Sequence, residues 1–178
     1  MLELKRACDG AEPDLDAIRD ARELARESLD ELRRISHELR PAVLDELGLA
    51  SALEALCSAF GRRTGLQVST VVAGALPELG RQVDLALYRV TQEALTNAAR
   101  HTRCSSVEVA LELSTGGRVV LRVCDDGLGM GGARPGGGIR GMRERALMAG
   151  GAFSIDPSGD GSGGTAVSIR VPVGEVRP

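Results

Sequence analysis

The chain has 178 residues, of which 43% are hydrophobic and 2% aromatic, and its formal net charge is −3. This length suits one globular domain with a helical extension, and the composition predicts an aliphatic core. A slightly acidic chain without basic runs is not expected to bind nucleic acid directly, and no apolar run approaches the ~20 residues that span a bilayer. We therefore expect a cytoplasmic portion without a membrane segment; any membrane anchor of the full-length protein would lie outside this chain.

The N-terminal part of the sequence predicts one long helix over residues 14–40. Its apolar residues recur at seven-residue steps, at Ile18, Ala25, Leu32 and Leu39. Such a narrow stripe cannot be buried by one helix, so we expect packing in a bundle or against a second subunit, the alternative being a helix that lies on its own domain. Pro41 should end this helix, and residues 1–7 should end an earlier one.

The rest of the sequence alternates predicted helices with predicted strands. Helices are expected over residues 48–61, 81–101 and 139–149. Strands are expected over residues 66–72, 106–113, 118–125, 151–156 and 165–173, and the STGG between the second and third strands predicts a hairpin. This order predicts an α+β fold, a two-layer α/β sandwich in which helices cover one face of a mixed sheet and the loops gather at one end.

The first candidate site is the stretch QEALTNAARH, residues 92–101, on a predicted helix. Glu93 and Asn97 are four residues apart and project from the same side, with Arg100 or His101 about one turn further along. An amide oxygen can bind Mg²⁺ together with phosphate oxygens and water, and a carboxylate one turn away can orient a water or accept a proton. By itself this spacing favours an ordinary polar helix surface.

The second candidate is CDDGLGM, residues 124–130, directly after a predicted strand. Asp125 stands at the strand end, where a carboxylate can accept the exocyclic N–H of a purine. Gly127 and Gly129 allow the backbone to pass close to a ligand or to adopt a positive φ. The alternative is a tight turn without a ligand.

The third candidate is a glycine-rich run that opens a helix. Seven of the twelve residues 127–138 are Gly, and the run continues as GGGIRGMRER. A helix N-terminus offers free N–H groups and a positive dipole end to phosphate, and the glycines predict a lid over a nucleotide. The alternative is a disordered linker. The run is neither a P-loop, because GxxxxGK[ST] is missing, nor a dinucleotide-binding fingerprint, because no βαβ unit surrounds it.

With GSGGTAVSIRVP near the C-terminus, these stretches resemble in order and spacing the N, G1, G2 and G3 boxes of histidine-kinase ATP-binding domains, which belong to the Bergerat-type or GHKL ATPases that include gyrase and MutL. QEALTNAARH and GMRERA are similar to the subfamily of the nitrate sensor kinases. The resemblance implies ATP and Mg²⁺ as cofactors, Glu93 as the catalytic residue and Asn97 as the metal ligand. The residues that it implies for ATP binding are Asn97, Arg100, His101, Asp125, Gly127, Gly129, Gly136, Gly138, Gly141 and Thr165.

The stretch RRISHELRP contains His37, which resembles the phosphorylated histidine of the larger kinase class. The 60 residues from His37 to Asn97 (97 − 37) are too few to hold the second hairpin helix that this class requires there. In the nitrate-sensor-like subfamily, LRP…LDELGL ends the second hairpin helix instead. We therefore predict a partial dimerisation hairpin over residues 1–44, an ATP-binding domain over residues 45–174 and an acceptor histidine upstream of this chain.

The resemblance thus implies the catalytic part of a two-component sensor histidine kinase. The phosphoryl group of ATP would pass to a histidine and then to an aspartate of a response regulator, which we expect to bind DNA, and the full-length protein should be a homodimer. One alternative is an anti-sigma-type serine kinase, although such kinases lack a dimerisation hairpin. The other is a nucleotide-binding regulatory module without kinase activity, which would not need both Glu93 and Asn97.

Overall fold

The computed structural model describes residues 16, 18–24, 41–74, 76–129, 136–158 and 163–173. The chain divides into two compact units, Met1–Arg40 and Pro41–Pro178. In the first unit the described residues are helical, as the sequence predicts for this place. His37 and most of the predicted helix 14–40 lie outside the described residues.

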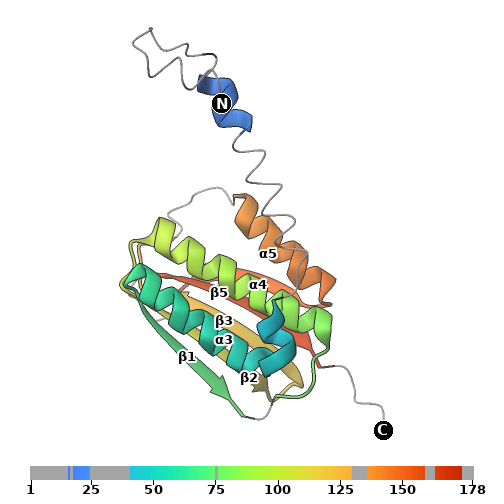
Figure 1. Cartoon of the computed structure of the whole chain (residues 1–178). Helices are drawn as coiled ribbons and strands as arrows, with labels where there is room; N and C mark the ends of the chain where they lie inside the picture. Colours follow the sequence, from blue (N-terminus) through green and yellow to red (C-terminus); the bar gives the residue numbers. More distant parts are fainter. Residues whose placement is uncertain are drawn as a thin grey trace. The chain divides into compact units, whose positions relative to one another are not determined.

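The second unit contains a five-stranded mixed sheet with the strand order β1-β2-β3-β5-β4 (Figure 1). β1 (Gln67–Ala73) runs parallel to β2 (Ser106–Ser114), and all other neighbours are antiparallel: β3 (Arg118–Asp125), β5 (Thr165–Pro172) and β4 (Ala152–Pro157). The predicted hairpin is formed by β2 and β3, and its turn is closed by the hydrogen bond from Gly117 N to Ser114 O. The last two strands of the chain pair with each other, so that β5 lies between β3 and β4, and β4 is at the edge of the sheet.

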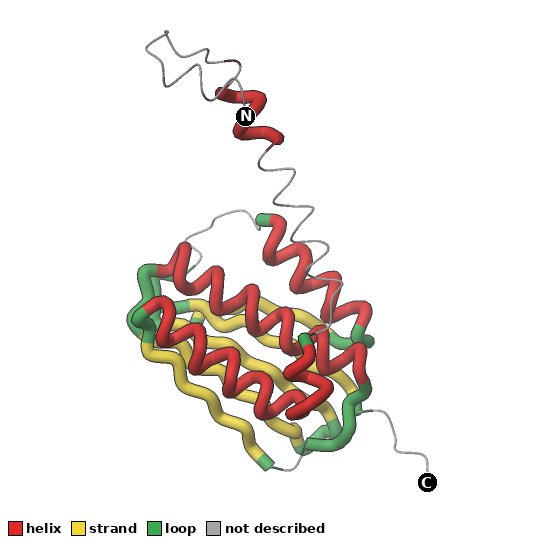
Figure 2. Tube along the Cα trace, viewed as in Figure 1, coloured by secondary structure: helices red, strands yellow, loops and turns green. Residues whose placement is uncertain are grey.

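Three helices, α3 (Ala42–Thr64), α4 (Arg81–Asn97) and α5 (Gly137–Met148), lie on one face of this sheet (Figure 2). The predicted fold class, a two-layer α+β sandwich, is therefore confirmed. Within the described ranges, no helix has the length and apolar character needed to cross a membrane.

The core between the sheet and the helices is aliphatic, as the composition predicts. Its strand residues alternate along β2 and β3: Val107, Val109, Leu111, Val119, Leu121 and Val123. Leu87 and Leu95 of α4 are fully buried in the same cluster. Because burial of one such leucine contributes ~1.5–3 kcal/mol, packing against the sheet holds α4, the helix that carries the first candidate site.

Helix α3 begins six residues before the predicted start at residue 48. Pro41 is its N-cap residue, with φ −62° and ψ 128°, so the proline that ends the preceding prediction also starts α3. Gly48 interrupts the helix with a φ of 73°. This kink breaks the helical spacing of apolar residues, which is why the sequence indicates a helix only beyond it.

Candidate functional site

The predicted helix 81–101 consists of two parts that meet at Asn97. α4 ends there, and the next five residues form a π-helix, η1 (Ala98–Thr102), in which the Thr102 hydroxyl donates to Ala98 O at 2.9 Å. π-Helical turns are rare and occur often at functional sites. This one follows directly after the residue for which the resemblance implies metal binding.

The N-terminal end of α5 lies against Glu93 and Asn97. A Cβ atom at Gly138 would overlap the Glu93 carboxylate and would lie 3.6 Å from Asn97 Nδ2. Only a glycine therefore lets the first turn of α5 approach α4 this closely. The fold thus brings Gly138 of the third candidate site next to Glu93 and Asn97 of the first, although they are more than 40 residues apart in the sequence.

The first turn of α5 has no side-chain cap. Its N-cap residue is Gly136, which makes no side-chain hydrogen bond, and Gly137 follows it. The leading N–H groups of a helix have no partner within the helix, so an uncapped N-terminus suits an anion such as phosphate. Here that N-terminus lies beside a carboxylate and an amide, the side chains of Glu93 and Asn97.

The two adjacent acids at the end of β3 differ in their surroundings. Asp126 accepts hydrogen bonds from the backbone and hydroxyl groups of Ser105 and Ser106, at 2.6–3.0 Å. The Ser105 hydroxyl bond, followed by the Ser106 backbone bond, holds the pKa of Asp126 well below its ordinary value. Asp125 is buried, and its Oδ1 accepts the Gly127 N–H at 2.9 Å. Asp126 thus anchors the start of β2, while Asp125 has one carboxylate oxygen that accepts no hydrogen bond from the described residues.

The loop that follows β3 is packed tightly between η1 and the start of β5. A Cβ atom at Gly127 would come within 2.6 Å of Thr102 Oγ1, and one at Gly164 would overlap the backbone carbonyl of Asp125. Leu128 N also donates to Thr102 O at 2.8 Å. These contacts leave no space for side chains at Gly127 and Gly164, so they fix Asp125 relative to both η1 and β5.

Thr165, the first residue of β5, lies beside this loop because Cys124 of β3 pairs with Ala166 of β5. It is buried, and its Oγ1 finds no hydrogen-bond partner among the described residues. A buried hydroxyl without a partner is uncommon and calls for a ligand or a water. Together with the Asp125 carboxylate, it provides a donor and an acceptor for the polar edge of a purine, so the residues present fit an adenine nucleotide.

The structure therefore places most of the predicted site residues in two neighbouring groups. Glu93, Asn97, Gly136 and Gly138 form one group, and Asp125, Gly127, Gly129 and Thr165 form the other. Thr102 of η1, five residues after Asn97, contacts the second group at Gly127. Gly129 has a φ of 70° and lies against Gly163.

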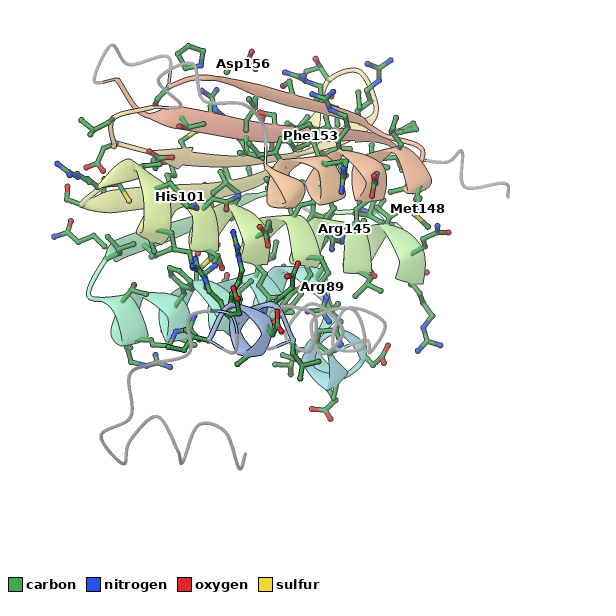
Figure 3. The ribbon with its side chains drawn as sticks, turned by 90° about the horizontal axis from the view of Figure 1, so that it is seen from above. Arg89, His101, Arg145, Met148, Phe153 and Asp156 are labelled. Carbon is green, nitrogen blue, oxygen red and sulfur yellow. The ribbon has the colours of Figure 1, made fainter. Side chains whose placement is uncertain are left out.

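Arg100 and His101 are exposed on η1, at the end of the helix layer opposite to Met148 (Figure 3). Gly141 differs from the other predicted glycines, because the group next to it is the Arg145 guanidinium. Sequence reasoning missed Thr102, Gly164 and Arg145. Gly164 stands in the quoted GSGG and could have been included, whereas nothing local marks Thr102 or Arg145.

The family described as "Histidine kinase-, DNA gyrase B-, and HSP90-like ATPase" matches residues 82–175, more than half of the chain. The chain belongs to this ATPase family. It is 40% identical over 157 residues to the sensor histidine kinase MctS of Rhizobium johnstonii, a match that covers 85% of this chain and 33% of that protein. It is 34% identical over 149 residues to the oxygen sensor histidine kinase NreB of Staphylococcus carnosus, covering 82% of this chain and 42% of that protein. The match with this chain thus spans less than half the length of each of these two histidine kinases.

A solved structure shows the same fold at lower sequence identity. The blue-light activated histidine kinase of Erythrobacter litoralis EL346 aligns with a TM-score of 0.60 and 23% identity, over 70% of this chain and 42% of that chain. These findings confirm the predicted resemblance to the ATP-binding part of sensor histidine kinases.

Proposed function

We propose that this chain binds ATP with Mg²⁺ and supplies the catalytic part of a two-component sensor histidine kinase. One observation carries the proposal: segments far apart in the sequence meet in the order that a nucleotide requires. The Asp125 carboxylate and the unpaired Thr165 hydroxyl lie at the end of β3 and the start of β5, a carboxylate and an amide lie on α4, and an uncapped helix N-terminus lies against them.

The adenine is proposed to bind at Asp125 and Thr165. The Asp125 oxygen that Gly127 does not use would accept the exocyclic amino group, and the buried Thr165 hydroxyl would gain the partner that it lacks. A buried polar group that becomes paired contributes more than an exposed one, because its desolvation has already been paid for in folding. Gly127 and Gly129 form the adjoining wall.

The phosphates are proposed to bind between α5 and the end of α4. The first N–H groups of α5, at Gly137 and Gly138 after the N-cap Gly136, would bind an anion favourably. Arg100 and His101, on η1 just beyond Asn97, are proposed to bind the phosphates as well. Asn97 would hold the magnesium ion through its amide oxygen. Bound magnesium supplies neutralisation of phosphate charge and alignment for in-line transfer, which are the main requirements of phosphoryl transfer.

Glu93 is proposed to act on the acceptor side of the reaction. It lies one turn before Asn97, and its carboxylate touches the first turn of α5, so it is next to the proposed phosphate site. A carboxylate in this position can orient the acceptor imidazole or hold its proton while the phosphoryl group is transferred.

The remaining elements of the proposal concern the whole protein. We propose that the acceptor histidine lies upstream of this chain, that the protein works as a cytoplasmic homodimer through the helix of residues 14–40, and that its partner is a DNA-binding response regulator. The curated relatives, which are sensor histidine kinases, support this proposal.

The proposal is tested by adding γ-labelled ATP and Mg²⁺ to this chain and to a longer form with the upstream segment. We expect acid-labile, base-stable phosphate, typical of phosphohistidine, on the longer form alone. Label on this chain that is lost in His37→Gln would place the acceptor at His37 and refute the upstream assignment. Acid-stable phosphate on a partner protein would favour the serine-kinase alternative.

A further inference from the structure

Arg145 of α5 is a partly buried cation. It is not among the ATP-binding residues described above. Its guanidinium lies over Gly141, where an added Cβ atom would come within 3.1 Å of Nη1. Within the described part of the chain, no carboxylate lies within ion-pair distance of Arg145 and no hydrogen-bond acceptor meets it. The glycine at position 141 therefore makes room for an arginine whose five N–H donors have no protein acceptor there.

A second guanidinium, that of Arg89, is close enough to Arg145 to feel its charge. Arg89 of α4 is buried and donates to Gln92 Oε1 at 2.7 Å. Burial lowers the pKa of the Arg89 guanidinium, Tyr88 raises it to a lesser extent, and the positive charge of Arg145 lowers it by a still smaller amount. Two guanidinium groups across a helix interface repel each other, and an anion bound by Arg145 would reduce this repulsion.

The position of Arg145 along the helices indicates which anion. α5 runs antiparallel to α4: Gly138 meets Glu93, Arg145 is near Arg89, and Gln82 Nε2 donates to Met148 O at 3.1 Å (Arg89, Arg145 and Met148 are labelled in Figure 3). Helical side chains lean toward the helix N-terminus, so Arg145 reaches back over Gly141. From there one helical turn, about 5 Å, separates it from the level of Gly138.

The elements of the proposed site follow one another along α4 and η1. Thr102 contacts the loop proposed to bind the purine, Asn97 is the proposed metal ligand, Glu93 is proposed to act at the reacting phosphate, and Arg89 with Arg145 comes next. The cation thus lies at the end of the site farthest from the adenine pocket. The group of ATP that reaches this end is the terminal phosphate.

We propose that Arg145 binds the terminal phosphate of ATP and thereby sets the preference of this site for ATP over ADP. The proposal rests on the proposed function, because it requires the nucleotide to lie between Asp125 and α5. ADP lacks the group that Arg145 would contact, so only ATP gains this interaction.

The test measures the Kd of Mg²⁺·ATP and of Mg²⁺·ADP by calorimetry for the wild-type chain, Arg145→Met and Arg145→Lys. Arg143→Met is the matched control, because Arg143 is two residues away, carries the same charge and lies 5.9 Å from the Phe153 ring on β4. We expect Arg145→Met to weaken ATP binding about tenfold, as for a lost charged hydrogen bond. ADP binding should change less than about twofold, Arg145→Lys should be intermediate, and Arg143→Met should bind both nucleotides as the wild type does.

A second variant keeps the proposal testable where Arg145→Met does not fold. Gly141→Ala retains the charge and pushes the guanidinium aside, so it should weaken ATP binding selectively but to a smaller extent. Equal weakening of ATP and ADP, or no change in either, would overturn the role of Arg145 while leaving the proposed function intact. Failure of the wild-type chain to bind either nucleotide would overturn both.

Discussion

Replacing Thr165 by Val should stabilise the ligand-free protein and weaken its binding of ATP. The side chain is 8% exposed, and Oγ1 is buried without a hydrogen-bond partner among the described residues. Burying an unpaired hydroxyl costs ~1–3 kcal/mol, and Val fills nearly the same volume with a methyl group and suits a strand. The substitution therefore removes the cost of burying an unpaired hydroxyl in the ligand-free protein, and it removes the hydrogen bond that this hydroxyl would make to bound ATP.

The magnitudes follow from these contacts. We expect the free energy of unfolding to rise by ~1 kcal/mol, at the lower end of the range because the hydroxyl lies at the start of β5, near the purine-binding loop. For a unit of this size, such a gain raises Tm by roughly 2–6 °C. Loss of one hydrogen bond to the nucleotide should weaken ATP binding by about tenfold, equivalent to ~1.4 kcal/mol.

The assay combines thermal unfolding of the ligand-free chain with calorimetric titration of Mg²⁺·ATP. Thr91→Val is the matched control: Thr91 is fully buried, but its hydroxyl donates to Leu87 O at 2.9 Å and is therefore already paired in the ligand-free protein. This control should not raise Tm and should leave the Kd unchanged. A lower Tm for Thr165→Val, or an ATP affinity equal to that of the wild type, would refute the reasoning that the hydroxyl awaits a nucleotide.

Two further predictions concern the α5 contact and the anchoring acid. Gly138→Ala should retain the fold but weaken ATP binding at least about tenfold, because its Cβ displaces the Glu93 carboxylate. In the control Gly137→Ala, an added Cβ meets nothing within 4 Å, so this variant should bind ATP as the wild type does. Equal ATP affinities of the two variants in calorimetric titrations would contradict the contact between Gly138 and Glu93. Asp126→Asn should lower Tm at neutral pH and flatten the acid limb of a Tm–pH profile. The folded pKa of Asp126 is depressed, so its contribution to stability is present above the unfolded value of about 3.9 and is lost as the pH falls. An unchanged acid limb would show that Asp126 does not anchor β2.

The secondary structure of the ATPase unit could be predicted from the sequence to a large extent. The alternation of apolar residues along 106–113 and 118–125 marks two strands, and the STGG between them marks their hairpin, because strand periodicity and turn chemistry are local properties. The order of the glycine-rich and acidic motifs also indicated the family. The early start of α3 and the π-helix after Asn97 could not be read, since a single Gly48 and one widened turn leave no periodic signal.

What the tertiary structure decided is which residues meet. The sequence shows two adjacent acids, but only the fold assigns Asp126 to the Ser105–Ser106 backbone and leaves Asp125 beside Thr165. The sequence also shows a row of glycines, but only the fold shows that Gly138 faces Glu93 and that Gly141 makes room for Arg145. These contacts join residues far apart in the chain or on separate helix turns, and they depend on strand order and helix packing. Local patterns determine the elements and carry the chemical groups, whereas close approach of the backbones determines which groups can act together.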